Sequence, residues 1–260
     1  MKSPFFRKKG NQAPPAPKPE SRPRPERPTF VVGDINGCHS ALEQILRVID
    51  KHISAHSLRS PHLVFVGNYI DLGPDTAKVA RHLLVLTREF PQNVICLMGN
   101  HERMLLDFLA EPGLRGARWL RSGGDATLRS FGLEPPQATP EGYAETGAKL
   151  AATLPKGLVA WMATRPLSWH SGNLWVVHAG ADPRSAMETQ SARVLLWGHP
   201  EFDTLQRNDG VWVAHGHSDV AEAKSSGGRI SVNTAAWRDG TLTAAAIMPD
   251  GTTTFLSAQA

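Results

Sequence analysis

The sequence predicts an α/β fold built on a parallel sheet, and three similar stretches carry that prediction. Each is an apolar run typical of a buried strand, followed at once by a glycine and a group of polar residues. The strands are expected at 30–32, 63–66 and 94–98, and the loops open at Gly33, Gly67 and Gly99. These glycines are 34 and 32 residues apart, close to the roughly 30 residues of a β-α-β unit. Loops at the same ends of parallel strands should meet at one crevice.

Helices are expected between and after these strands. Apolar residues recur at helical spacing over 41–51 and again over 75–86, where Asp75 is suited to cap the helix. A third helix should begin directly after Gly99, which places Asn100 and His101 at its N-terminal side.

The second half of the chain has a different sequence pattern. Residues 111–165 are helical in pattern and interrupted by Gly and Pro, which predicts a helical insertion that covers the crevice and is suited to substrate selection. Trp119 and Trp161 within it are expected to be core residues. Beyond residue 166 the pattern favours strands, expected at 167–170, 174–177, 211–214, 229–233, 242–248 and 252–256.

The charge is distributed unevenly. Residues 1–28 hold eight Lys/Arg, two Glu and eight of the 20 prolines, which predicts a disordered, basic, Pro-rich tail. This tail could contact an acidic partner. Residues 29–260 form the expected folded domain, with 20 basic and 22 acidic residues. That near-neutral balance gives no nucleic-acid footprint.

The remaining composition excludes several classes of protein. Cys38 and Cys96 make neither a disulfide framework nor a zinc-ligand spacing, so a reducing compartment is expected. No run of about 18 apolar residues is present, and residues 1–10 lack the apolar region of a secretory signal. We therefore expect a cytoplasmic protein without a transmembrane segment.

The ends of the predicted strands carry side chains that can bind a metal or move a proton. Carboxylate, amide and imidazole groups together suit Mn, Fe or Zn better than an all-oxygen calcium site. Five loops that all end in such groups are unlikely to occur in one chain by chance. The residues are Asp34, Asn36, Asn68, Asp71, Asn100, His101, His178 and His217.

These loops resemble those of the calcineurin-like metallophosphoesterases, in the branch of bacterial Ser/Thr protein phosphatases and symmetrical diadenosine tetraphosphate hydrolases. That family's pattern is Gly-Asp-x-His-Gly, Gly-Asp-x-x-Asp-Arg-Gly and Gly-Asn-His-Glu, then a strand-end His and a Gly-His. The intact segment 99–102, Gly-Asn-His-Glu, is the most specific match. The resemblance implies a four-layer α/β/β/α sandwich with a two-metal centre between the sheets.

The resemblance also implies roles for single residues. Asp34 would bind the first metal, and Asn100, His178 and His217 would bind the second. His101 would donate a proton to the leaving oxygen, with Asp71 fixing its tautomer.

Three positions depart from the family pattern. Asn36 replaces its first-loop His, Asn68 replaces its metal-bridging Asp, and Leu72 replaces its phosphate-clamping Arg. An amide oxygen can still coordinate a metal, so Asn36 and Asn68 remain candidate ligands, but an amide does not offset the charge of two dications. We therefore expect one strong and one weak metal site.

Two functions fit this pattern. The first is a metal-dependent hydrolase of phosphate esters, either of phosphoserine and phosphothreonine in proteins or of dinucleoside polyphosphates, with weakened activity. The alternative is a pseudophosphatase, a module that binds a phosphorylated or acidic partner without turnover. The departures favour the alternative, and the retained residues favour the hydrolase.

Overall fold

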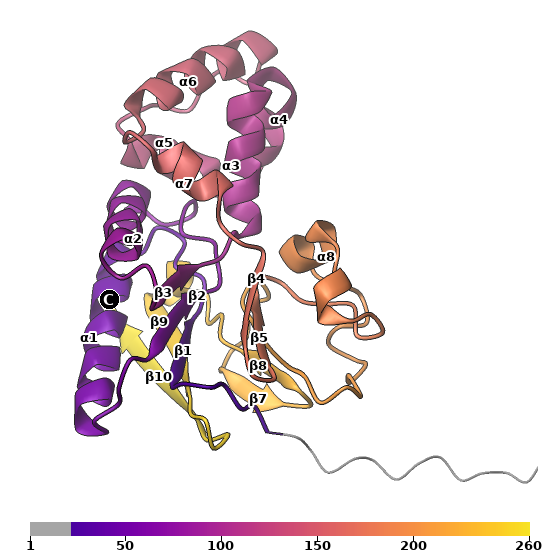
Figure 1. The fold of residues 1–260 in the computed structure, drawn as a ribbon. Coiled ribbons are helices and arrows are strands. Elements are labelled where there is room, and N and C mark those ends of the chain that lie inside the picture. Colours follow the sequence, from indigo (N-terminus) through magenta and orange to yellow (C-terminus); the bar gives the residue numbers. More distant parts are fainter. Residues whose placement is uncertain (1–21) are drawn as a thin grey trace, which may run out of the picture.

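The computed structural model describes residues 22–260 of the chain (Figure 1). The prediction of a disordered tail over residues 1–28 does not hold for residues 22–28, because these pack against the strand pair β4–β5. The Arg24 backbone N–H donates to Asn173 Oδ1 at 2.6 Å, and the Glu26 N–H donates to Ser171 Oγ at 2.9 Å. The remainder of the predicted tail lies outside the described residues.

The first sheet holds the three predicted parallel strands. They are β1 (Thr29–Val32), β2 (His62–Phe65) and β3 (Val94–Cys96). Two antiparallel strands, β9 (Thr241–Ile247) and β10 (Thr253–Gln259), extend the sheet in the order β10-β9-β1-β2-β3. Helices α1 (His39–Ala55) and α2 (Thr76–Glu89) cover its outer face (Figure 1).

The second sheet has the order β4-β5-β6-β8-β7. Its strands are β4 (Ser168–Ser171), β5 (Leu174–Val177), β6 (Trp212–His215), β7 (Lys224–Ser226) and β8 (Arg229–Ser231). β5, β6 and β8 are parallel. The sequence analysis missed β7, since this short edge strand is polar and exposed throughout and lacks an apolar pattern.

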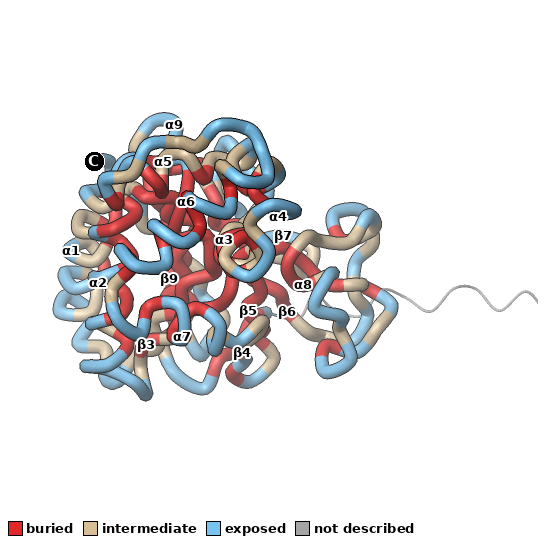
Figure 2. The backbone as a smooth tube through the Cα atoms, turned by 90° about the horizontal axis from the view of Figure 1, so that it is seen from above, coloured by how far each residue is buried: buried red, intermediate tan, exposed pale blue. Residues whose placement is uncertain are grey.

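The two sheets pack face to face through aliphatic side chains, among them Val31, Val64 and Leu97 from one sheet and Val176 and Ile230 from the other. Buried residues run through the centre of the molecule, as Figure 2 shows. The outer face of the second sheet is covered by the short helix α8 (Ala192–Trp197), the 3-10 turn η2 (Met187–Thr189) and loops. The α/β/β/α order is therefore confirmed, with a thin fourth layer.

A helical group follows β3. It comprises α3 (Asn100–Ala110), α4 (Pro112–Trp119), a kinked turn η1 (Leu120–Gly124), α5 (Asp125–Ser130), α6 (Pro140–Thr153) and α7 (Leu158–Ala163). These helices stand above the upper end of the first sheet in Figure 1. Trp119 and Trp161 are buried, as predicted. A last short helix, α9 (Ala236–Asp239), precedes β9. None of the helices in residues 22–260 is both long and apolar enough to cross a bilayer.

Candidate active site

The loops at the carboxyl ends of β1, β2, β3, β5 and β6 meet at one edge of the sandwich, where the predicted polar residues lie. Their backbones are unusual. Five of the eight non-glycine residues with left-handed φ in the described chain belong to these loops: Asn36, Asn68, Asp71, Leu72 and His217. Such conformations cost about 1–3 kcal/mol each outside Asn, Asp and Gly, and they cluster at functional sites.

Glycines allow the loops to approach one another closely. A Cβ on Gly99 would lie 2.3 Å from both the backbone nitrogen and Oδ1 of Asn68. A Cβ on Gly216 would lie 2.1 Å from Asp34 Oδ1. Both positions therefore require glycine, because any side chain would push apart the loops that form the site.

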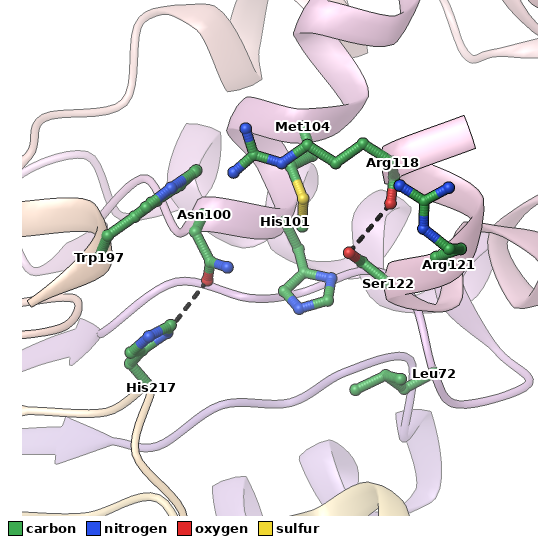
Figure 3. Close-up of a pocket in the computed structure, with 9 residues that line it drawn as sticks. All are labelled: Leu72, Asn100, His101, Met104, Arg118, Arg121, Ser122, Trp197 and His217. Carbon is green, nitrogen blue, oxygen red and sulfur yellow. Dashed lines mark hydrogen bonds between the residues drawn. The ribbon is translucent and has the colours of Figure 1, made fainter. Parts of the chain in front are cut away.

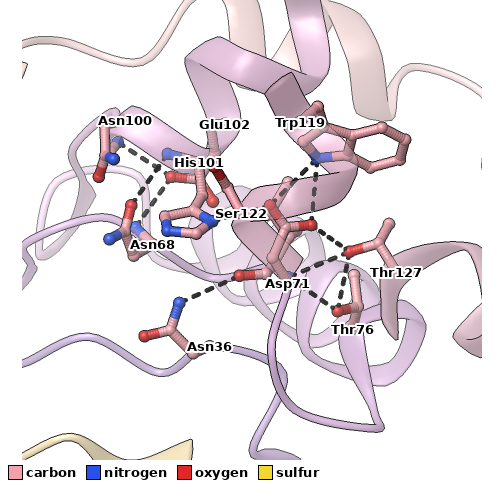
Figure 4. A network of polar contacts seen from close by, with 12 residues as sticks. Asn36, Asn68, Asp71, Thr76, Asn100, His101, Glu102, Trp119, Ser122 and Thr127 are labelled. Atoms are coloured by element: carbon pink, nitrogen blue, oxygen red, sulfur yellow. Dashed lines mark hydrogen bonds and ion pairs between the residues drawn. The ribbon is translucent and has the colours of Figure 1, made fainter. Parts of the chain in front are cut away.

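Asp71 is fully buried and holds His101 in place (Figure 4). His101 Nδ1 donates to Asp71 Oδ2 at 2.8 Å. The indole N–H of Trp119 donates to the same carboxylate at 3.1 and 3.3 Å, and the Thr127 hydroxyl donates to Oδ1 at 2.6 Å. Burial alone would lower the pKa of His101, but the hydrogen bond and charge of Asp71 outweigh it and raise that pKa. The other ring nitrogen, Nε2, is left for the pocket.

Asn100, His178 and His217 direct an amide oxygen and two ring nitrogens at a common space. His178 Nδ1 donates to the Val66 carbonyl at 2.9 Å, and burial keeps the pKa of His178 well below its usual value. Its Nε2 therefore carries a lone pair, yet it faces Asn100 Oδ1 at 2.8 Å. His217 Nδ1 lies 3.3 Å from the same oxygen. An amide oxygen and two imidazole nitrogens gathered in this way suit a cation, because both kinds of atom bind divalent metals.

Asp34 and Asn68 are arranged differently. The Asn68 amide donates from Nδ2 to Asp34 Oδ2 at 2.9 Å, and Asn68 Oδ1 accepts the His101 backbone N–H at 3.1 Å. A backbone N–H can only donate, so this pairing fixes which end of the amide faces Asp34. Burial raises the pKa of Asp34 to about 7, against the Asn68 amide and the His217 N–H. The first-metal side therefore holds an amide donor beside its carboxylate and does not fit a metal as it stands.

Glu102 braces the loops. Its buried carboxylate accepts the backbone N–H groups of Asn68 and Tyr69 at 2.8 Å and of Gly99 at 2.9 Å. Asn36 is held likewise, since its Nδ2 donates to the Ile70 carbonyl at 3.2 Å. These contacts fix the second loop against the first and third, and they use three of the roughly four acceptor positions of the fully buried Glu102 carboxylate.

Two neighbours of the site take no part in it. His39 is the first residue of α1 and its Nε2 lies 3.3 Å from His82 Nδ1. Burial and the nearby Asp75 raise the pKa of the Cys38 thiol to about 11, so it is a poor nucleophile.

An open pocket adjoins these residues (Figure 3). Asn100, His101 and His217 line it together with Leu72, Met104 and residues of the helical group: Arg118, Arg121 and Ser122. Trp197 of α8 also lines it, and Trp197 and His217 both line a second pocket that includes Arg193 and His199. Sequence reasoning missed Trp119, Thr127, Arg118 and Arg121 as site residues, because nothing in their spacing points to the strand ends.

The sequence matches the calcineurin-like phosphoesterase family over residues 27–235, and the chain belongs to that family. It is 24% identical to an asymmetrical bis(5'-nucleosyl)-tetraphosphatase of Oceanobacillus iheyensis, covering 78% of this chain and 82% of the relative. A symmetrical bis(5'-nucleosyl)-tetraphosphatase of Methylococcus capsulatus is 25% identical over 63% of this chain, and the match spans 47% of that relative. Serine/threonine-protein phosphatase 1 of Salmonella typhimurium is 38% identical over 38% of this chain and 40% of its own length.

Solved structures share the fold. A candidate diadenosine tetraphosphatase superposes with a TM-score of 0.60 at 19% identity, covering 91% of this chain and 98% of its own. A cold-active protein-tyrosine phosphatase of a Shewanella species gives 0.58 at 16% identity, covering 92% and 83%.

Members of this family generally use divalent metals. Within residues 22–260, no group of three or more His, Cys, Asp or Glu side chains is arranged to hold a metal ion. Two imidazoles and an amide do lie together, at His178, His217 and Asn100.

Proposed function

We propose that the chain is a metal-dependent hydrolase of phosphate esters that works with one well-held divalent ion. The buried pair of Asp71 and His101 carries the proposal. Three side chains, His101, Trp119 and Thr127, donate to Asp71. The bond from His101 Nδ1 leaves the Nε2 edge of the imidazole to the pocket. Such an arrangement serves proton transfer, since it fixes the tautomer and raises the basicity of the free nitrogen.

His101 is the proposed general acid. With Nδ1 engaged by Asp71, Nε2 of the protonated ring is the atom that would give its proton to the leaving oxygen. Asn100, His178 and His217 would hold the ion, which when bound supplies Lewis-acid polarisation of the phosphoryl group and a nucleophilic water. Asp34 and Asn68 shape the opposite wall of the site through their mutual hydrogen bond.

A second candidate, the pseudophosphatase, is favoured by that same hydrogen bond. Asn68 donates an amide hydrogen bond to Asp34 where the family pattern has a second carboxylate. A site of this kind would bind a phosphate ester without cleaving it. The two proposed functions thus differ in one point: the hydrolase requires that one ion and His101 suffice for the reaction, whereas the pseudophosphatase does not.

The proposal is tested by assaying the purified chain with added Mn on p-nitrophenyl phosphate, a phosphothreonine peptide and diadenosine tetraphosphate. We expect slow, Mn-dependent hydrolysis that falls at least about a hundred-fold in His101→Gln, the usual range for losing a general acid. Arg129→Gln, on the exposed side of α5, is the control. Hydrolysis that His101→Gln leaves unchanged contradicts the proposal. Binding of the peptide or nucleotide without any turnover supports the pseudophosphatase.

The substrate is proposed to be a phosphorylated protein or a nucleotide. The second pocket beyond Trp197 offers space for the part of a substrate that extends past its phosphate. Cys38 and Cys96 are both free thiols, which supports a cytoplasmic location.

A further inference from the structure

Leu72 stands where the family pattern has its phosphate-clamping arginine, and the structure shows what has taken up the space beside it. The turn η1, a kink between α4 and α5, docks on this residue. The Leu72 N–H donates to the Gly123 carbonyl at 3.2 Å, and Gly123 has a φ of 97°. A Cβ at Gly123 would lie 2.6 Å from Leu72 Cδ2. The turn therefore needs a glycine in order to sit on Leu72.

The ends of the same turn are fixed to the Asp71–His101 pair. Trp119 directly precedes η1 and Thr127 follows it by three residues, and both donate to the Asp71 carboxylate (Figure 4). One buried carboxylate thus positions both His101 and the segment between these two donors.

Two guanidinium groups reach the pocket from this region, Arg121 within that segment and Arg118 directly before it. Arg118 and Arg121 both line the pocket beside His101 (Figure 3). No Asp or Glu lines this pocket, and no carboxylate of residues 22–260 lies within 4.0 Å of either guanidinium. Arg118 lies over the Trp197 ring at 5.0 Å. By contrast, Arg115 on the same helix pairs with Glu111, and Arg129 on α5 pairs with Asp125.

We propose that Arg118 and Arg121 bind the phosphoryl group in this site and replace, from the helical insertion, the clamp that Leu72 cannot provide. Guanidinium groups suit this task because they are always charged and donate in pairs to phosphate oxygens. The inference rests on the proposed phosphate-ester ligand but not on turnover, since it applies equally to a hydrolase and to a binding module.

The test measures the binding of inorganic phosphate to the full chain by calorimetry, both without metal and with one equivalent of Mn. The variants are Arg118→Gln, Arg121→Gln and the double change, with Arg115→Gln as a control that removes the same charge from α4 outside the pocket. We expect the double variant to weaken phosphate binding by about ten-fold or more, as for lost charge-assisted hydrogen bonds. Arg115→Gln should bind as the unaltered chain does.

A second pair of variants tests the docking of the turn. Gly123→Ala places a methyl group against Leu72, whereas Gly132→Ala, also at positive φ, meets nothing within 4 Å. Both carry backbone strain, but only Gly123→Ala should weaken phosphate binding. Circular dichroism confirms that each variant is folded.

The results separate this inference from the proposed function. Arginine-dependent phosphate binding without hydrolysis supports the clamp and contradicts the hydrolase. Phosphate binding that the double variant leaves unchanged overturns the clamp, whether or not the chain hydrolyses esters. An unaltered chain that fails to bind phosphate under both conditions also overturns it.

Discussion

Asn68 is the residue at which the two halves of the site differ most. Its amide donates to Asp34 and its oxygen accepts the His101 N–H, so a hydrogen bond joins two groups that a metal ion would otherwise bridge. A carboxylate at position 68 could not donate, and it would add negative charge beside a buried acid. Asn68 is therefore the residue whose replacement tests whether this side of the site can hold an ion.

We predict that Asn68→Asp lowers the melting temperature of the metal-free chain and raises its response to Mn. Losing the hydrogen bond and burying a second carboxylate should cost about 2 kcal/mol or more, and a bound cation should recover it. Thermal melts with EDTA and with Mn measure both effects. Asn68→Ala loses the same hydrogen bond without adding a charge, so an equal response to Mn in that variant contradicts the prediction.

Trp119 is a second single residue that shapes the site, because its indole N–H donates to Asp71. We predict that Trp119→Phe lowers hydrolysis about ten-fold, because Asp71 loses one of the donors that fix its orientation toward His101. Its stability should fall by about 1.5–3 kcal/mol for the lost hydrogen bond to a charged group.

Trp161→Phe is the matched control for this change. Trp161 is also buried, and its indole N–H donates to Thr87 Oγ1 at 2.9 Å, away from the site. Urea unfolding should show a similar loss of stability in both variants, while only Trp119→Phe loses activity. Equal activity in the two would show that Asp71 does not depend on the indole.

At the scale of elements, the segment 22–28 serves as a strap across the strand pair β4–β5. Its contacts include the hydrogen bonds from Arg24 and Glu26 and one from Asn173 Nδ2 to the Arg22 carbonyl at 2.9 Å. Pro23 and Pro25 within it are buried. The strap is thus part of the folded domain.

We predict that a chain starting at Arg22 melts at the same temperature as the full chain. A chain starting at Pro28 should melt about 5 °C lower, if the lost contacts contribute roughly 2 kcal/mol to a domain of this size. Differential scanning calorimetry compares the three chains. Equal melting of the two shortened chains would show that the strap adds no stability.

At the scale of the whole molecule, the proposed metal ligands come from both sheets. Asn100 follows β3 of the first sheet, while His178 and His217 follow β5 and β6 of the second. An ion held by all three would tie the two sheets together in the folded state. Since the unfolded chain does not assemble this cluster, the ion should stabilise the fold by mass action.

We predict one tightly held ion per chain after loading with Mn and removal of the excess, measured by elemental analysis. Mn at a hundred-fold excess over its Kd should add about 2.7 kcal/mol of stability. His217→Ala should abolish both the ion and the rise in melting temperature. Two tightly held ions per chain would contradict the difference between the two halves of the site.

The sequence by itself determined the fold class and most of the strands. Periodic apolar runs ending in glycine specify buried strands and their exits wherever they occur, because side-chain burial follows local pattern. It also identified Asp34, Asp71, Asn100, His101, His178 and His217 as residues of interest, since five loops ending in such groups are unlikely to occur in one chain by chance. The predicted ligand roles of Asn36 and Asn68 remain proposals, with Asn68 turned toward Asp34 as a donor.

The tertiary structure alone decided how these residues are held. Trp119 and Thr127 lie 48 and 56 residues from Asp71 along the chain, and contacts at such separations leave no local pattern. The packing of Gly123 on Leu72 and the direction of Arg118 and Arg121 also depend on how the insertion docks. Local sequence sets which elements form, but only the packing of the whole chain brings distant side chains to the same carboxylate.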